Sequence, residues 1–379
     1  MMAKKMLKRS TLCLLSMAMT GMSQGVWAES TSAVLPILKN SASAEWCDAN
    51  VQKLQQRISQ LEKQTVQPQS AAAPVLAEWD QLMASFEDFA GPINLYSNVD
   101  PDAKLRKTAD DCEVKINQLQ TEIYQNPILY QRIKNTKATD SIDQKYRQDI
   151  LDGFEDTGVQ LAPEKRARLK NILDELTKLS QQFSRNIRDN PEKLEFTPAE
   201  LKGLPESYIS ALKKNDKGNY LLGFDYPEYQ PFMELSERDD ARKRYQTAFT
   251  RRGTEKNLTL LKQIIDLRYE QAQLFGQSSY ADWALKKRMA KNPKTVNHFL
   301  ADVHNVVAPL EQKEVEELRA FKAKSLKISL DKAEINRWNM AYWSEKLRKD
   351  KYQVDQEKLR DYFPTLAAQK WLFAISESK

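Results

Sequence analysis

The chain has 379 residues, with 58 Lys or Arg against 52 Asp or Glu and a formal net charge of +6. Hydrophobic residues make up 41% of the sequence and charged residues 29%, which is typical of a folded globular protein and not of a disordered one. A nucleic-acid-binding protein would carry a large, clustered excess of basic residues, so nucleic acid is not expected as a partner.

Glycine is scarce, with ten residues in the whole sequence. Gly21 and Gly25 fall in the first 28 residues, which leaves eight for the other 351. That is too few for the turns of a sandwich, a barrel or a doubly wound sheet. None of the eight forms a glycine-rich phosphate loop. We therefore expect a mostly α fold, a multi-helix bundle.

Residues 1–28 have the three parts of an export signal. Four basic residues come first, namely Lys4, Lys5, Lys8 and Arg9. A short apolar stretch over 12–19 follows, about half of the ~20 residues that span a bilayer. Small residues then predict cleavage between Ala28 and Glu29. We expect an exported, periplasmic or secreted protein with no stable membrane insertion, whose remaining net charge is +2 once four charges are subtracted from +6.

Export changes the meaning of the cysteines, because only Cys47 and Cys112 remain after cleavage. Two thiols in an oxidising compartment favour one disulfide, which would link two helices of the N-terminal region. The alternative is two buried free thiols. Two cysteines alone make a poor structural zinc site, which uses four ligands.

Residues 29–190 are predicted to form a helical domain. Apolar spacing predicts a helix over 45–64, a linker over 65–74 and a second helix that stops at Gly91–Pro92. Asp100 is expected to cap a third helix that begins at Pro101, and Asn126 to cap the next at Pro127. Gly158 is expected to end the segment that follows. A long amphipathic helix then runs from Pro163 to 190–191.

Residues 191–235 are predicted to form a small insert that contains a β-hairpin. Short strands are expected at 194–196 and 220–224, with a turn at 216–219 between them. From 236 to 379 the chain is expected to be helical again. The predicted ranges are 236–250, 254–275, 278–289, 293–324, 331–349, 355–362 and a last helix after Pro364. Asn292 is expected to cap the helix that begins at Pro293.

Residue chemistry alone identifies no catalytic and no metal-binding residue. The two histidines, His298 and His304, are six residues apart, which places them about 120° apart on a helix. A zinc peptidase helix instead carries histidines four residues apart on one face. We expect both histidines to lie in solvent beside an apolar stripe of Phe299, Val303, Val306 and Leu310.

A series of short motifs, in order, resembles the N-terminal half of the thimet oligopeptidase and oligopeptidase A family of zinc metallopeptidases. The strongest part of the resemblance lies between 252 and 290. The motifs are 97–101 with Leu105-Arg106, 158–161, 183–187, 201–205, a strand end at Pro227 and Pro231, Arg252-Gly253 with Asn257, Asp266-Leu267-Arg268 with Glu270 and Ala272, 274–276, 279–282, Met289-Ala290, Trp338 with Tyr342, 352–355 and 362–364.

The resemblance implies a helical, saddle-shaped zincin-like oligopeptidase with a deep channel that admits short peptides. It also implies zinc as cofactor, held by an H-E-x-x-H helix and a further glutamate downstream of the Tyr362-Phe363-Pro364 segment. Those ligands do not occur in this sequence. Residues 236–379 are therefore expected to be the start of a truncated catalytic domain, inactive alone. A second departure is Asn339, where the family usually has an acidic residue.

Three hypotheses follow. The first is a truncated, monomeric form of an exported zinc oligopeptidase that acts on short peptides. The second is a non-catalytic helical protein of the cell envelope that binds peptides or a partner. The third is complementation, in which a separate chain supplies the zinc-binding half. Exposed apolar residues in the last helix favour the first hypothesis over the second.

Overall fold

The computed structural model describes residues 42–63, 72–353, 359 and 361–378. The expected signal peptide, its cleavage site at Ala28 and Glu29, and most of the expected linker and of the 355–362 helix lie outside the described residues. The part that is described is mostly helical with one small antiparallel sheet, which confirms the predicted fold class. Within it, no helix has both the length and the apolar character of a membrane span.

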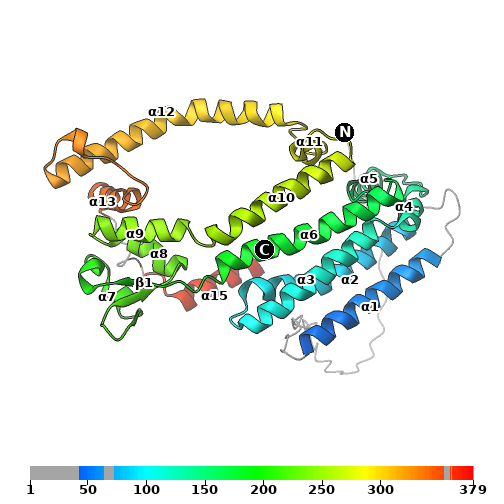
Figure 1. Cartoon of the computed structure of the whole chain (residues 1–379), viewed down its shortest axis with the longest axis horizontal. Helices are drawn as coiled ribbons and strands as arrows, with labels where there is room; N and C mark the ends of the chain where they lie inside the picture. Colours follow the sequence, from blue (N-terminus) through cyan, green and yellow to red (C-terminus); the bar gives the residue numbers. More distant parts are fainter. Residues whose placement is uncertain (1–41, 64–71, 354–358, 360, 379) are drawn as a thin grey trace, which may run out of the picture.

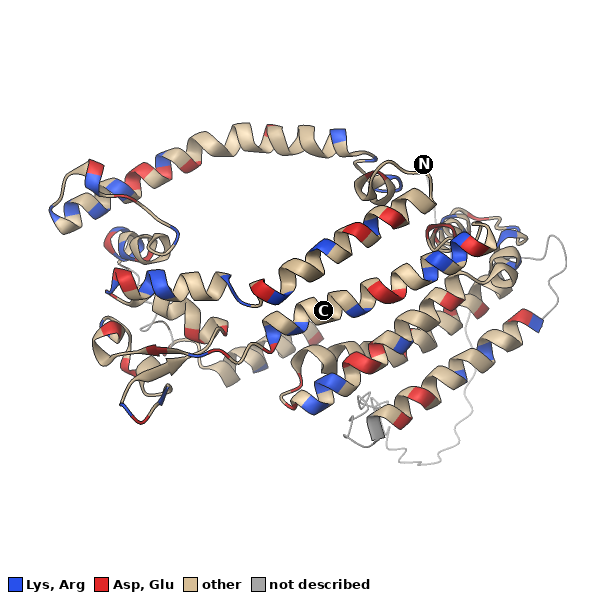
Figure 2. Ribbon diagram, viewed as in Figure 1, with Lys and Arg blue, Asp and Glu red and all other residues tan. Residues whose placement is uncertain are grey.

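The first six helices form one layered bundle, in which the first, second, third and sixth lie alongside one another and the fourth and fifth lie at one end (Figure 1). They are α1 (Ala42–Lys63), α2 (Ala72–Val99), α3 (Ala103–Tyr124), α4 (Pro127–Lys134), α5 (Ser141–Asp156) and α6 (Pro163–Arg188). The central helix is α3, which packs against α1, α2 and α6. Figure 2 shows acidic and basic residues interspersed along these helices.

Helix starts follow the predicted capping chemistry with one exception. The Asn126 side chain accepts hydrogen bonds from the backbone N–H groups of 128 and 129, and Asn292 accepts one from that of 295. At the third helix the cap is Asp102 and not Asp100, so that prediction was wrong. Asp100 instead accepts a hydrogen bond from the backbone N–H of Asp102 at 2.8 Å, a turn that sets up the cap.

The predicted stop at Gly91–Pro92 was also wrong, because α2 continues through Pro92 to Val99. A proline inside a helix costs about 3 kcal/mol. Burial offsets this cost here, since Phe89 and Ile93 on either side of the proline are packed in the core. Tertiary packing thus outweighs a local helix-breaking signal.

The buried apolar residues form separate clusters. The largest runs from Cys47 to Val159 and is supplied by α1 to α5. Phe154 lies at its centre, with ring centroids 5.2 Å from Trp79, 5.3 Å from Tyr124 and 5.8 Å from Tyr130. A second cluster draws on the segment 196–245, and a small third one joins Leu318, Tyr342 and Trp343. The domain boundaries at 190 and 235 stay predictions.

The insert has three strands, β1 (Leu194–Phe196), β2 (Lys213–Lys214) and β3 (Tyr220–Leu222), in the order β1-β3-β2. The predicted strand at 194–196 is confirmed, and the one predicted over 220–224 forms but ends at Leu222; the two pair antiparallel, with Leu194 opposite Leu222. The hairpin itself joins β2 to β3, and Asn215 organises its turn by accepting hydrogen bonds from the backbone of 217 and 219. A 3-10 turn (Pro198–Leu201) and α7 (Glu206–Ile209) lie between β1 and β2.

The prolines after the sheet do not end a strand, contrary to expectation. Pro227 and Pro231 lie in α8 (Tyr226–Leu235), where Pro227 occupies the first turn and needs no N–H donor. The rest of the chain forms α9 (Asp239–Thr250), α10 (Thr254–Leu274), α11 (Tyr280–Leu285), α12 (Pro293–Leu326), a 3-10 turn (Leu330–Lys332), α13 (Met340–Tyr352) and α15 (Thr365–Glu377). The helix expected over 331–349 begins only at Met340, because a turn at 336–339 precedes it.

Candidate functional site

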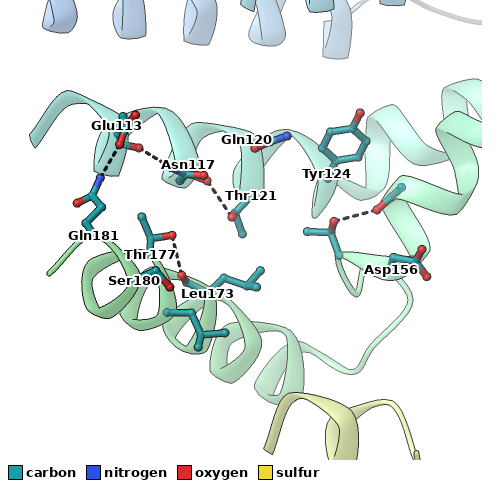
Figure 3. Close-up of a pocket in the computed structure, with 13 residues that line it drawn as sticks. Glu113, Asn117, Gln120, Thr121, Tyr124, Asp156, Leu173, Thr177, Ser180 and Gln181 are labelled. Carbon is teal, nitrogen blue, oxygen red and sulfur yellow. Dashed lines mark hydrogen bonds between the residues drawn. The ribbon is translucent and has the colours of Figure 1, made fainter. Parts of the chain in front are cut away.

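A polar cavity of about 660 Å³ lies between α3, α5 and α6 (Figure 3). Most of its lining side chains are amides and hydroxyls, and Glu113 and Asp156 lie at opposite ends of it. The lining residues are spread over 113–181 at ordinary helical spacing, so no sequence motif indicated this cavity.

Glu113 is held by neighbouring helices. It accepts a hydrogen bond from the Ser97 hydroxyl at 2.8 Å, from the Asn94 amide at 3.1 Å and from the Gln181 amide at 3.0 Å. At the other end, Asp156 forms an ion pair with Lys287 at 3.1 Å. Both carboxylates therefore link structural elements, and the hydroxyl beside Glu113, that of Ser97, is buried.

The hydroxyls of the cavity are also engaged locally. Those of Thr121, Thr157 and Thr177 donate to carbonyls one turn earlier, at distances from 2.8 to 3.0 Å. Burial and the nearby Glu87 carboxylate raise the pKa of Tyr124. The Tyr124 phenol thus stays protonated at neutral pH. The cavity offers polar contacts to a ligand but no acid–base pair for catalysis.

The two histidines lie on α12, and both are exposed as expected. His298 Nε2 is 3.4 Å from Asp302 Oδ2 on the same helix. Among the residues that the structure describes, no three His, Cys, Asp or Glu side chains come together as metal ligands. With only two histidines in the sequence, six positions apart on an exposed helix, the residues present do not fit a peptidase zinc site.

Cys47 in α1 and Cys112 in α3 form a disulfide, with 6.0 Å between their Cα atoms. Both residues are buried. They are the two cysteines expected to pair after export.

Residues that carry the family resemblance fix α10 against α6. The Asn257 amide donates to the backbone oxygen of Phe183 at 3.0 Å, and its own Oδ1 accepts from Asn186 at 2.8 Å. Arg168 forms a bidentate pair with Glu270, with both N–O distances at 2.6 Å. The Arg168 hydrogen bonds are the main cause of a lowered pKa of Glu270. These motif residues therefore position α10 against α6.

The polar pairing at Asn339 is satisfied. Its buried amide donates to Asp239 Oδ1 at 3.3 Å and its Oδ1 accepts from the backbone N–H of Asn336 at 2.8 Å. Asp239 also accepts from Trp338 Nε1 at 2.9 Å and from Arg242 at 2.8 Å. An aspartate at 339 would face the Asp239 carboxylate, so an amide suits this position better in this chain.

Comparison with known proteins gives the family. Residues 232–378 match the model of peptidase family M3. Oligopeptidase A of Salmonella typhimurium is 30% identical over 325 residues, which cover 78% of this chain and 47% of that protein, and oligopeptidase A of Escherichia coli has the same values. Saccharolysin of Saccharomyces cerevisiae is 26% identical over 326 residues, covering 81% and 46%. The chain spans about half the length of these curated relatives. It belongs to the family of thimet oligopeptidase and oligopeptidase A.

Proposed function

We propose that this chain is the N-terminal part of an exported, zinc-dependent metallo-oligopeptidase that hydrolyses short peptides. The observation that carries the proposal is the match of residues 232–378 to peptidase family M3, extended by 30% identity to oligopeptidase A over 325 residues. The family is zinc-dependent in general, and the name oligopeptidase A describes a peptidase that acts on short peptides.

The residues present would supply the scaffold, and the zinc site would come from sequence beyond them. A bound zinc ion would supply Lewis-acid chemistry for the hydrolysis of a peptide bond. Since the two histidines do not fit that site, the 379-residue chain by itself is proposed to be inactive in hydrolysis.

Export is part of the proposal. The basic, apolar and small-residue segments of 1–28 support it, and so does the Cys47–Cys112 disulfide, because such bonds persist in oxidising compartments. Intact mass spectrometry of protein from its source cells tests both points. We expect the mass of a chain that begins at Glu29, and a gain of about 2 Da on reduction. A retained N-terminus would contradict export.

Hydrolysis of short fluorogenic peptides tests the catalytic part. Protein from the source cells should cleave them, lose activity with a zinc chelator and regain it with added zinc. The recombinant 379-residue chain, assayed beside it, should show no chelator-sensitive cleavage. Hydrolysis by the 379-residue chain that a chelator leaves unchanged would overturn the proposal.

A non-catalytic peptide-binding role is the second candidate, and the polar cavity between α3, α5 and α6 favours it. It predicts that protein from the source cells binds short peptides without cleaving them. Replacing Ser180, an exposed lining residue, with a bulky Trp should then weaken binding, whereas Ile142→Trp, outside the cavity, should not.

A further inference from the structure

Exposed apolar side chains are distributed unevenly over the chain. In the described residues before 250, large apolar side chains are mostly buried in the first two clusters. Most of the exposed large apolar side chains of the described chain lie after residue 257, and many of these are on α10, α12 and α15. Exposed apolar surface of this extent marks a site that contacts another polypeptide, a membrane or a ligand, or a region prone to aggregation.

The first half of α12 is the clearest example of an exposed apolar surface. This helix has 34 residues, of which only Leu318, near its C-terminal end, is buried. Phe299, Val303, Val306 and Leu310 form a stripe at helical spacing and are 63%, 42%, 77% and 57% exposed. A bare helix of this kind gains little from its own hydrogen bonds and relies on packing for stability.

The charge pattern of α12 points the same way. Between 295 and 310 the only charged side chain is Asp302, whereas acidic and basic residues crowd 311–326. Figure 2 shows this change along the helix. A helix face exposed to water normally carries charges, and the core of a protein interface is depleted of them. The first half of α12 therefore has the composition of an interface.

A second stripe lies on α10. This helix packs on α6, where the side chains of Asn257 and Glu270 are hydrogen-bonded to that helix. A different side of it carries an apolar stripe that stays exposed, made of Leu258, Leu261, Ile265 and Tyr269. In Figure 1 α12 arches over α10, and α11 contacts both of them at one end. We call the two stripes together the α10–α12 face.

We propose that the α10–α12 face binds the downstream half of the M3 fold, the part that this chain does not span in its relatives. The proposal rests on the proposed function. Two findings identify the occupant. Both helices lie inside the segment 232–378 that matches the peptidase family, and the relatives are about twice as long as the part that aligns, with 47% of oligopeptidase A covered.

Site-specific photocrosslinking in the source cells tests this proposal. p-Benzoylphenylalanine is placed at position 306 on α12 and, as a matched control, at position 142 on α5. Val306 and Ile142 are 77% and 79% exposed, so both probes reach solvent equally, but only the first lies on the α10–α12 face. Mass spectrometry should find position 306 joined to a polypeptide segment of the M3 family that follows the Tyr-Phe-Pro motif, and position 142 joined to none. Crosslinks from 306 to a second copy of residues 42–378, to lipid or to an unrelated protein, or no crosslink, would overturn the proposal.

A double substitution, Val303→Glu with Val306→Glu, adds a readout of function. Both side chains are exposed, so the melting temperature of the 379-residue chain should not change. Crosslinking from a probe at Ile265 should fall at least tenfold, and chelator-sensitive hydrolysis by the complete protein should fall with it. If hydrolysis persists while the crosslinks fail, the face is assigned wrongly and the peptidase function stands. If the crosslinks form but no hydrolysis is found, the function fails and the face stands.

Discussion

The helices α1 to α6 and the pair α10 and α12 differ in how far their apolar residues are buried. Both regions consist of amphipathic helices with apolar stripes. In the layer, α3 has neighbours on several sides, and its apolar residues are buried along its whole length. On α12 the stripe is just as regular, yet it faces solvent. An apolar stripe thus predicts that a helix packs, but not that its partner is among the residues described.

The largest expected effect on the free energy of unfolding is that of Phe154→Ala, compared with Phe299→Ala. Phe154 is fully buried among three aromatic rings, whereas Phe299 is mostly exposed on α12. Phe154→Ala should lower the free energy of unfolding by about 3–5 kcal/mol, through lost burial and the cavity left behind. Phe299→Ala should change it by less than about 0.5 kcal/mol. Urea unfolding of both variants measures the difference, and equal losses would show that α12 is packed in the isolated chain.

The disulfide comes next. It closes a loop across a sequence separation of 65 and ties α1 to α3 within the layer. Replacing both Cys47 and Cys112 by Ala should lower the free energy of unfolding by about 2–4 kcal/mol, chiefly because the unfolded chain gains conformational freedom. Thermal unfolding of the variant, and of the unmodified chain with and without reductant, checks this. A melting temperature that neither change lowers would mean that the bond does not form in solution.

Substitutions at two glycines with positive φ distinguish the cost of an unfavourable backbone conformation from the cost of steric crowding. Gly158 has φ +85° and a Cβ there would lie 2.6 Å from Leu169, whereas Gly218 has φ +79° and open space around it. Gly218→Ala should cost about 1 kcal/mol for the backbone conformation alone. Gly158→Ala should cost about 1–3 kcal/mol more, because it also overpacks the junction of α5 and α6. Equal losses in urea unfolding would contradict the crowding at Gly158.

The smallest effect concerns pH. Hydrogen bonds from Arg188, and then from Arg106, hold the pKa of Asp189 below its usual value. A lowered folded-state pKa contributes stability above the unfolded value of about 3.9 and loses it as pH falls through the folded value. Asp189→Asn should therefore cost under about 1 kcal/mol at pH 7, given its partial exposure, and less at pH 3.

Urea unfolding at the two pH values measures the Asp189 contribution. The control is Asp111→Asn, which removes an exposed pair with Lys107 and should change stability by less than about 0.5 kcal/mol at either pH. An Asp189→Asn variant whose loss grows toward pH 3 would reverse the expected sign.

Helix caps depend on local chemistry, and two of the three caps predicted from the sequence form as predicted. The caps at Asn126 and Asn292 depend on a side chain and the next few N–H groups, and both form. The continuation of α2 through Pro92 depends on what Phe89 and Ile93 meet in the folded core, which no local pattern contains. Strand β2 was missed because two lysines that pair only through their backbone carry no apolar alternation.

The candidate site likewise combines features that the local sequence predicts with features that depend on tertiary packing. The exposure of His298 and His304 could be inferred from their place beside the stripe of α12. The polar cavity could not, since Glu113, Gly153 and Gln181 come from three helices whose meeting depends on the packing of the whole layer. The motif residues Asn257 and Glu270 indicated the family, but their contacts with α6 became visible only in the fold.

Hydrogen exchange on the isolated 379-residue chain tests the central contrast most directly, because it measures the stability of each helix separately. We predict that the amides of α3 exchange only with global unfolding, whereas those of the first half of α12, residues 297–310, exchange at least a hundredfold faster. Addition of a polypeptide with the downstream half of the M3 fold, the proposed partner, should slow the exchange of 297–310 and leave that of α3 unchanged. Protection of 297–310 equal to that of α3 in the isolated monomer would contradict the account, since α12 would then need no partner.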